Sequence, residues 1–136
     1  MAVMRPKTVV KLRSRGRGTS HSKTEITIRD LEFAIDEPEA RGGTNAGATP
    51  TEMALAALTG CTNVIGHKCA DKLGVDIGHL DIQVTCEFDR RGVTLEEEID
   101  TPFVGLRQVV TSNGPASDED LRRVATEVAK FCPLSK

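Results

Sequence analysis

Polar and apolar residues alternate along the first third of the chain, which is the pattern of half-buried β-strands. The alternation is clearest over 24–29 and 31–36, and a further strand is expected over 8–13. The segment 15–18, Arg-Gly-Arg-Gly, has the glycines of a turn. This part of the sequence therefore predicts a three-stranded antiparallel meander.

Apolar residues take up helical spacing after a glycine-rich loop over 38–48. Thr49 and Glu52 fit a capping box, which predicts a helix that runs to about Leu73. The segment 53–58 within it is apolar on all sides. We expect this segment to be buried on every side, in contact with a second copy of the chain.

The second half of the chain predicts further strands and a second helix. Strands are expected over 80–88, 93–99 and 103–111, and the helix begins after an N-cap at Ser117. The inner face of this helix carries Leu121, Val124, Ala125, Val128 and Cys132. The order of elements predicts an α+β fold of antiparallel strands with two helices, and the length of 136 residues predicts one domain over 1–136.

Composition narrows the classes of function. The net charge of -2 argues against nucleic acid or an anionic membrane as a partner, and the chain lacks the tryptophan and tyrosine of a base-stacking surface. No apolar segment is long enough to span a bilayer, and the first residues lack the apolar core of a secretory signal. We therefore expect a cytoplasmic protein whose four cysteines are reduced.

Basic residues are concentrated at the start of the chain. Seven of them, and no acidic residue, precede Glu25: Arg5, Lys7, Lys11, Arg13, Arg15, Arg17 and Lys23. They form either a phosphate-binding arm or a charged hairpin that protects a sheet edge. The second interpretation is favoured, because the basic residues alternate with strand residues and no aromatic residue accompanies them.

Cys61 and Cys132 are the candidates for thiol chemistry. Cys61 lies inside the first helix, where it is either an inert apolar residue or a thiol activated by a positive charge from elsewhere in the chain. Cys132 precedes Pro133 at the point where the second helix must end. The negative end of the helix dipole disfavours a thiolate there, which suits Cys132 to a resolving role more than to an attacking one.

The other cysteines indicate core positions. Cys69 is about 12 Å from Cys61 along a straight helix, too far for a disulfide, and Cys86 lies among apolar strand residues. His67 falls on the opposite side of the helix from Cys61, and no C-x-x-C motif is present. The sequence therefore predicts neither a metal site nor a cofactor.

Arg41 and Glu52 flank the start of the first helix. Arg41 is either a solvated loop residue or part of a lid whose guanidinium lowers the pKa of Cys61 and binds a substrate oxygen. Glu52 is explained by the capping box, and it is also placed to orient an arginine. One carboxylate has to serve both roles.

Three strings of residues together resemble the OsmC/Ohr family, which includes osmotically inducible protein C and organic hydroperoxide resistance protein. They are Gly-Gly-Thr-Asn at 42–45, Thr-Pro-Thr-Glu-Met-Ala-Leu-Ala-Ala-Leu-Thr-Gly-Cys-Thr at 49–62 and Cys-Pro-Leu-Ser at 132–135. The resemblance implies an intertwined homodimer in which two sheets wrap around central helices. It also implies a thiol peroxidase that dithiols, such as lipoyl groups, regenerate.

By position, the resemblance makes Cys61 the peroxidatic cysteine and Cys132 the resolving cysteine, and it places Arg41 near the catalytic arginine. One departure concerns the arginine-holding glutamate, which in the peroxidase branches directly follows the proline. Here Thr51 occupies that position and Glu52 comes one residue later. One residue is about 100° of helix rotation, so the carboxylate points in another direction.

Three hypotheses follow. The first is a cytoplasmic peroxidase of organic hydroperoxides that acts through a Cys61 sulfenic acid and a Cys61–Cys132 disulfide. The second is a non-catalytic dimer of the same fold that binds a thiol or a small ligand, with Cys61 inert, and Thr51 favours it. The third, nucleic-acid binding by the basic N-terminal hairpin, is disfavoured by the mildly acidic chain.

Overall fold

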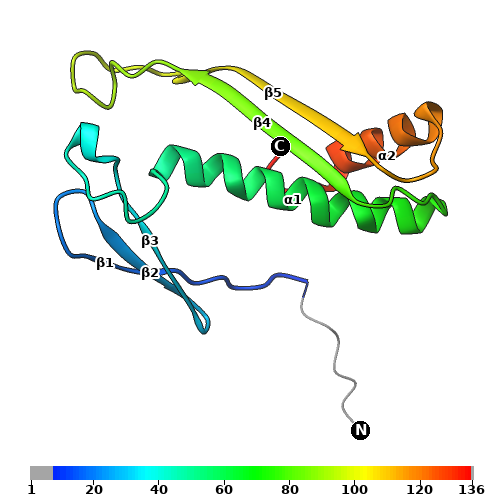
Figure 1. Cartoon of the computed structure of the whole chain (residues 1–136), viewed down its shortest axis with the longest axis horizontal. Coiled ribbons are helices and arrows are strands. Elements are labelled where there is room, and N and C mark those ends of the chain that lie inside the picture. Colours follow the sequence, from blue (N-terminus) through cyan, green and yellow to red (C-terminus); the bar gives the residue numbers. More distant parts are fainter. Residues whose placement is uncertain (1–7, 136) are drawn as a thin grey trace, which may run out of the picture. The chain divides into compact units, whose positions relative to one another are not determined.

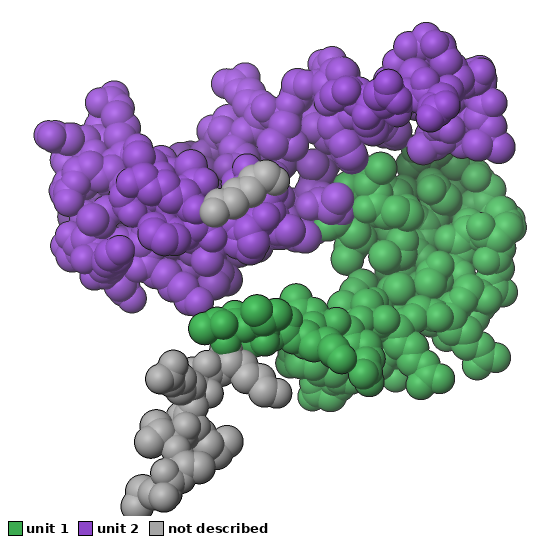
Figure 2. Space-filling view, turned by 180° about the vertical axis from the view of Figure 1, so that it is seen from behind, with its two compact units in different colours: residues 1–53 green, residues 54–136 purple. Residues whose placement is uncertain are grey.

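A computed structural model describes residues 8–135. They divide into two compact units, with the boundary between Met53 and Ala54 (Figures 1 and 2). The elements in order are β1 (Arg15–Gly18), β2 (Thr24–Ile28), β3 (Leu31–Ile35), η1 (Glu39–Arg41), α1 (Pro50–Leu73), β4 (Leu80–Phe88), β5 (Phe103–Ser112) and α2 (Asp118–Phe131). The α+β class with antiparallel strands and two helices is confirmed. The boundary between the units falls inside α1, and the prediction of one domain over 1–136 stays a prediction.

The first unit holds the expected antiparallel meander, in the order β1-β2-β3. The position of its first strand was predicted wrongly: β1 is the segment expected to be a turn, and the segment 8–13 is not a strand. A tight connection explains the shift, because Thr19 N–H donates to Lys23 O at 3.0 Å and pairs Gly18 with Thr24. The basic residues Arg5 and Lys7 lie outside the described residues.

Helix α1 begins and ends as predicted. Thr49 N–H donates to Glu52 Oε1 at 2.9 Å, and Glu52 N–H donates to Thr49 Oγ1 at 3.2 Å, which completes the capping box. Gly74 follows the helix with a left-handed φ of 68°. The complete burial expected for 53–58 is not found within the single chain, because its alanines are exposed. Their cover by a second copy stays a prediction.

The second unit packs α1 and α2 against a β4–β5 hairpin, which lies alongside α1 (Figure 1). Its core is a cluster of Cys69, Ala70, Ile77 and Val124, with partly buried neighbours that include Leu80. The helix comes close to the sheet at the buried Gly66, where a Cβ atom would lie 3.4 Å from Leu80 Cδ1.

The strand expected over 93–99 is absent, and this part of the chain forms turns between β4 and β5. Arg91 closes these turns by binding Asp89 through several hydrogen bonds and Glu97 at 2.8 Å. Leu95 has a left-handed φ of 62°, which a strand does not tolerate. Among the described residues, no helix has both the length and the apolar character needed to cross a bilayer.

Candidate active site

The structure brings together the two cysteines singled out in the sequence. Cys61 Sγ and Cys132 Sγ lie 2.8 Å apart, both thiols are free, and both belong to the second unit. Cys61 is half-buried in the middle of α1, whereas Cys132 is completely buried at the C-cap of α2. The distance is longer than a disulfide bond, which is about 2.05 Å, and it places the two thiols in direct contact, within hydrogen-bonding reach.

The end of α2 fixes the position of Cys132. Its N–H donates to Val128 O at 2.9 Å as the last helical hydrogen bond, and its extended backbone then leads into Pro133. Ser135 N–H donates back to Cys132 O at 3.2 Å and closes a turn over 132–135. The Cys-Pro-Leu-Ser string is therefore a helix stop that holds a thiol against α1.

The two thiols ionise unequally. The hydrogen bond with Cys132 and then burial raise the pKa of Cys61. Burial by itself would raise the pKa of Cys132, but hydrogen bonds from the Cys61 thiol and from Ser135 and Leu134 outweigh it and lower that pKa. When the pair loses its first proton, the negative charge therefore lies on Cys132. The helix dipole alone predicts the opposite, because it disfavours a thiolate at the end of α2.

Arg41 and Glu52 both belong to the first unit, and each has a partner there. Arg41 ends the short helix η1, and its Nε lies 3.3 Å from Glu37 Oε2. Glu52 serves the capping box, and its pKa is lowered by the Thr49 N–H, then by the Thr49 hydroxyl, with a smaller effect of the Arg41 charge. The arginine therefore has Glu37 as its ion-pair partner.

Glu37 is the residue that reasoning from the sequence missed. It stands four residues before Arg41, just ahead of η1, and its carboxylate forms an ion pair with the Arg41 guanidinium. A loop was expected over 38–48, so the spacing between Glu37 and Arg41 carried no weight. The structure instead has η1 there, with Arg41 N–H donating to Pro38 O at 2.9 Å.

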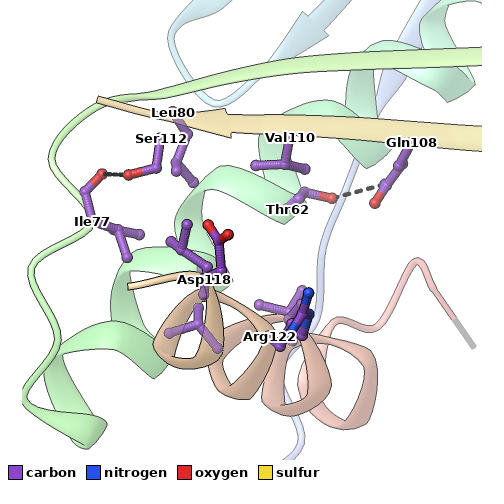
Figure 3. Close-up of a pocket in the computed structure, with 13 residues that line it drawn as sticks. Thr62, Ile77, Leu80, Gln108, Val110, Ser112, Asp118 and Arg122 are labelled. Carbon is purple, nitrogen blue, oxygen red and sulfur yellow. Dashed lines mark hydrogen bonds between the residues drawn. The ribbon is translucent and has the colours of Figure 1, made fainter. Parts of the chain in front are cut away.

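A cavity of about 380 Å³ opens between α1, α2 and the hairpin of the second unit (Figure 3). Its wall is mainly apolar, with Leu80, Val110 and Val124 among the lining residues. Gln108 Nε2 donates to Thr62 Oγ1 at 3.0 Å across this wall, and the charged side chains of Asp118 and Arg122 also line the cavity. Cys61 and Cys132 are not among the lining residues, although Thr62 follows Cys61 directly.

The other cysteines named in the sequence analysis lie in or beside the core. Cys69 belongs to the core cluster, and Cys86 is half-buried on the inner face of β4. Within residues 8–135, no three His, Cys, Asp or Glu side chains are grouped so that they could hold a metal ion. Cys61 and Cys132 remain the two cysteines whose thiols are in contact with each other.

One protein family matches most of the chain. The family model described as OsmC-like protein matches residues 43–136, which include Cys61 and Cys132. None of the curated proteins matches the sequence.

Solved structures show the same fold. The OsmC-like protein from Mycoplasma pneumoniae is 18% identical, with a TM-score of 0.74, and the match covers 93% of this chain and 85% of that one. The organic hydroperoxide resistance protein OsmC from Legionella pneumophila is 13% identical, with a TM-score of 0.66 and coverage of 95% and 89%. OhrB, an organic hydroperoxide resistance protein of Bacillus subtilis, is 23% identical, with a TM-score of 0.63 and coverage of 93% and 88%.

Proposed function

Because the chain belongs to the OsmC-like protein family, we propose that it is a thiol-dependent peroxidase that reduces organic hydroperoxides to alcohols in the cytoplasm. The observation that carries the proposal is the 2.8 Å distance between the Sγ atoms of Cys61 and Cys132. Two thiols that are distant in sequence and adjacent in space can cycle between reduced and disulfide states without a large rearrangement.

The proposed reaction has three steps. The Cys61 thiolate attacks the distal oxygen of the hydroperoxide, the O–O bond breaks, and the alkoxide takes a proton to leave as an alcohol. The sulfur of Cys132 then attacks the Cys61 sulfenic acid, which forms the disulfide and releases water. An external dithiol of the lipoyl type reduces this disulfide by exchange and becomes a disulfide itself.

The unequal thiols fit the second step better than the first. A lowered pKa makes Cys132 the thiolate of the pair, and a thiolate is what must attack the sulfenic sulfur. The raised pKa of Cys61 means that its own attack requires a further positive charge. We propose that Arg41 supplies this charge, while Glu52 caps α1 and contributes to the field at the arginine.

The substrate and partner classes follow from the relatives and from the surface. Two of the structural neighbours are named organic hydroperoxide resistance proteins, which supports an organic hydroperoxide as substrate. The exposed alanines of α1 and the apolar residues of β5, such as Leu106 and Val109, support a homodimer that covers them. Neither nucleic acid nor a membrane is part of the proposal.

A second candidate is a non-catalytic dimer that binds a thiol or a small ligand with Cys61 inert. Two observations favour it: Thr51 stands where the peroxidase branches have glutamate, and the pKa of Cys61 is raised. In this alternative the thiol pair stays closed, and hydroperoxides leave it unchanged.

The test is the consumption of cumene hydroperoxide in the presence of dihydrolipoamide. The wild type should turn over, and Cys61→Ser should reduce the rate to that of the reagents alone. Cys86→Ser is the matched control, since it removes a half-buried thiol outside the pair, and it should keep most of the rate. A wild-type rate in Cys61→Ser rejects the peroxidase.

A further inference from the structure

The loop between β3 and α1 is built around one buried carboxylate. Asp36 is completely buried, and its oxygens accept hydrogen bonds from the backbone N–H groups of Glu37 at 2.7 Å and of Thr44 and Ala46 at 3.1 Å. The Thr44 hydroxyl donates a further hydrogen bond at 2.5 Å. A buried carboxylate held by this many donors fixes both ends of the segment that it spans.

Two glycines show independently how tightly the same loop is closed. A Cβ atom on Gly43 would collide with the backbone of Glu37, and one on Gly47 would collide with the backbone of Ala34. In both cases the obstacle is backbone rather than a flexible side chain. The loop therefore packs on its own preceding strand, in one conformation, and carries η1 on its outer side.

Glu37 and Arg41 are the two charges that this loop presents together. Glu37 Oε2 is shielded from solvent and accepts no hydrogen bond of good geometry from the described residues. Its charge is compensated by Arg41 Nε at 3.3 Å, because a shielded carboxylate oxygen requires a nearby cation. Within residues 8–135 this ion pair engages Arg41 through Nε, so the two Nη groups keep their donors for a second anion.

We propose that Asp36 and Glu37 are positioning residues for Arg41: Asp36 holds the loop in one conformation, and Glu37 orients the guanidinium with its Nη groups outward. Glu37 thereby takes the role of the glutamate that Thr51 replaces. The proposal rests on the proposed function for its effect on catalysis, whereas the holding of Arg41 is independent of it.

The first experiment is a double-mutant cycle on peroxidase kinetics. Glu37→Gln should lower kcat/KM by roughly ten- to a hundredfold, the range expected when a catalytic group is misplaced. In an Arg41→Ala background the same change should have no effect, because Glu37 acts through Arg41. Glu39→Gln, an exposed neighbour in η1, is the matched control and should be neutral. An equal loss in both backgrounds overturns the proposal.

The second experiment does not require peroxidase activity. Trypsin must bind the Arg41 side chain in its own pocket and the flanking backbone in an extended form. The ion pair with Glu37 must therefore break and the loop must open, so Asp36→Asn and Glu37→Gln should both accelerate cleavage at this bond. Cleavage after Lys68, inside α1 in the other unit, requires this helix to unfold and should keep its wild-type rate in Glu37→Gln. An unchanged rate at Arg41 in Glu37→Gln overturns the proposal, even if the protein proves to have no peroxidase activity.

Discussion

Cys61 Sγ and Cys132 Sγ lie 2.8 Å apart, although 71 positions separate the two residues in the sequence. The contact depends on where α2 ends, because Cys132 is the C-cap and is completely buried. The core that packs α2 on α1, through Val124 and Cys69, therefore also sets the distance between the thiols.

The shared hydrogen bond predicts a split titration of the two thiols. In the wild type, one thiol should ionise below and the other above the ordinary thiol pKa, because Cys132 is stabilised as the thiolate and Cys61 as the thiol. Cys61→Ala removes the hydrogen-bond partner of Cys132 and should raise the pKa of the remaining thiol. Cys132→Ala should lower the pKa of Cys61, which then keeps the raising effect of burial and the opposing effect of the Leu134 backbone hydrogen bond. Thiolate absorbance near 240 nm as a function of pH measures both.

The control for this titration is Cys86→Ala, which should preserve both steps of the wild type. A low step that survives unchanged in Cys61→Ala would mean that the two sulfurs do not share a hydrogen bond in solution.

The capping box predicts a measurable loss of stability in Thr49→Ala. Glu52 N–H loses its acceptor, Thr49 Oγ1, so the free energy of unfolding should fall by about 1 kcal/mol. Thr126→Ala, at an exposed position inside α2, is the control and should be neutral or slightly stabilising. Urea unfolding followed by circular dichroism compares the two, and equal effects would contradict a capping role.

Asp36 predicts a loss of stability in acid. Its pKa is lowered well below the ordinary 3.8, first by the Thr44 hydroxyl, against the opposing effect of burial, with help from the backbone N–H groups of Ala46 and Glu37. A carboxyl whose pKa is lower in the folded state stabilises the fold above its unfolded pKa and loses this contribution as the pH falls. Asp36→Asn should therefore be less stable than the wild type at pH 7, and the difference should shrink below pH 3.8.

Denaturant unfolding at several pH values between 7 and 3 provides the measurement. A difference between Asp36→Asn and the wild type that does not change with pH would show that the ionised carboxylate is not what holds the loop.

Gly47→Ala should destabilise the chain, because its Cβ atom would meet the carbonyl of Ala34 and backbone would have to move. We expect a loss of about 1–3 kcal/mol. Gly60→Ala is the opposite case: no atom lies within 4 Å of the added Cβ, and alanine is favoured in a helix, so it should stabilise by about 1 kcal/mol. Thermal unfolding of both variants tests whether Gly47→Ala lowers the stability and Gly60→Ala raises it.

Local signals were sufficient for most of the fold. The capping box at Thr49 and Glu52 and the glycine after Leu73 fixed α1 to the residue, and the alternation over 80–88 fixed β4. The strand expected over 93–99 failed because ion pairs of Arg91 close turns there, and such pairs leave no periodic trace in a sequence. The prediction put the first strand at the wrong residues. Hydrogen-bonded pairing with β2, rather than the alternation of polar and apolar residues, decides which residues join the sheet.

The candidate site was predictable only in part. The sequence pointed to Cys61 and Cys132, but their distance depends on how α2 packs, which no local pattern encodes. The thiolate was expected to be disfavoured at Cys132 because only the helix dipole was considered, whereas the turn after Cys132 adds donors. Glu37 was missed because the carboxylate expected to hold Arg41 was sought after Pro50.

The most direct test of the central claim is to add one equivalent of cumene hydroperoxide per chain to the reduced protein and to map the products by mass spectrometry without reductant. The account predicts rapid loss of two thiols per chain and a peptide in which Cys61 is linked to Cys132. Thiols that disappear no faster than those of free cysteine, with no linked peptide, would contradict it and leave a fold whose thiol pair does no peroxidase chemistry.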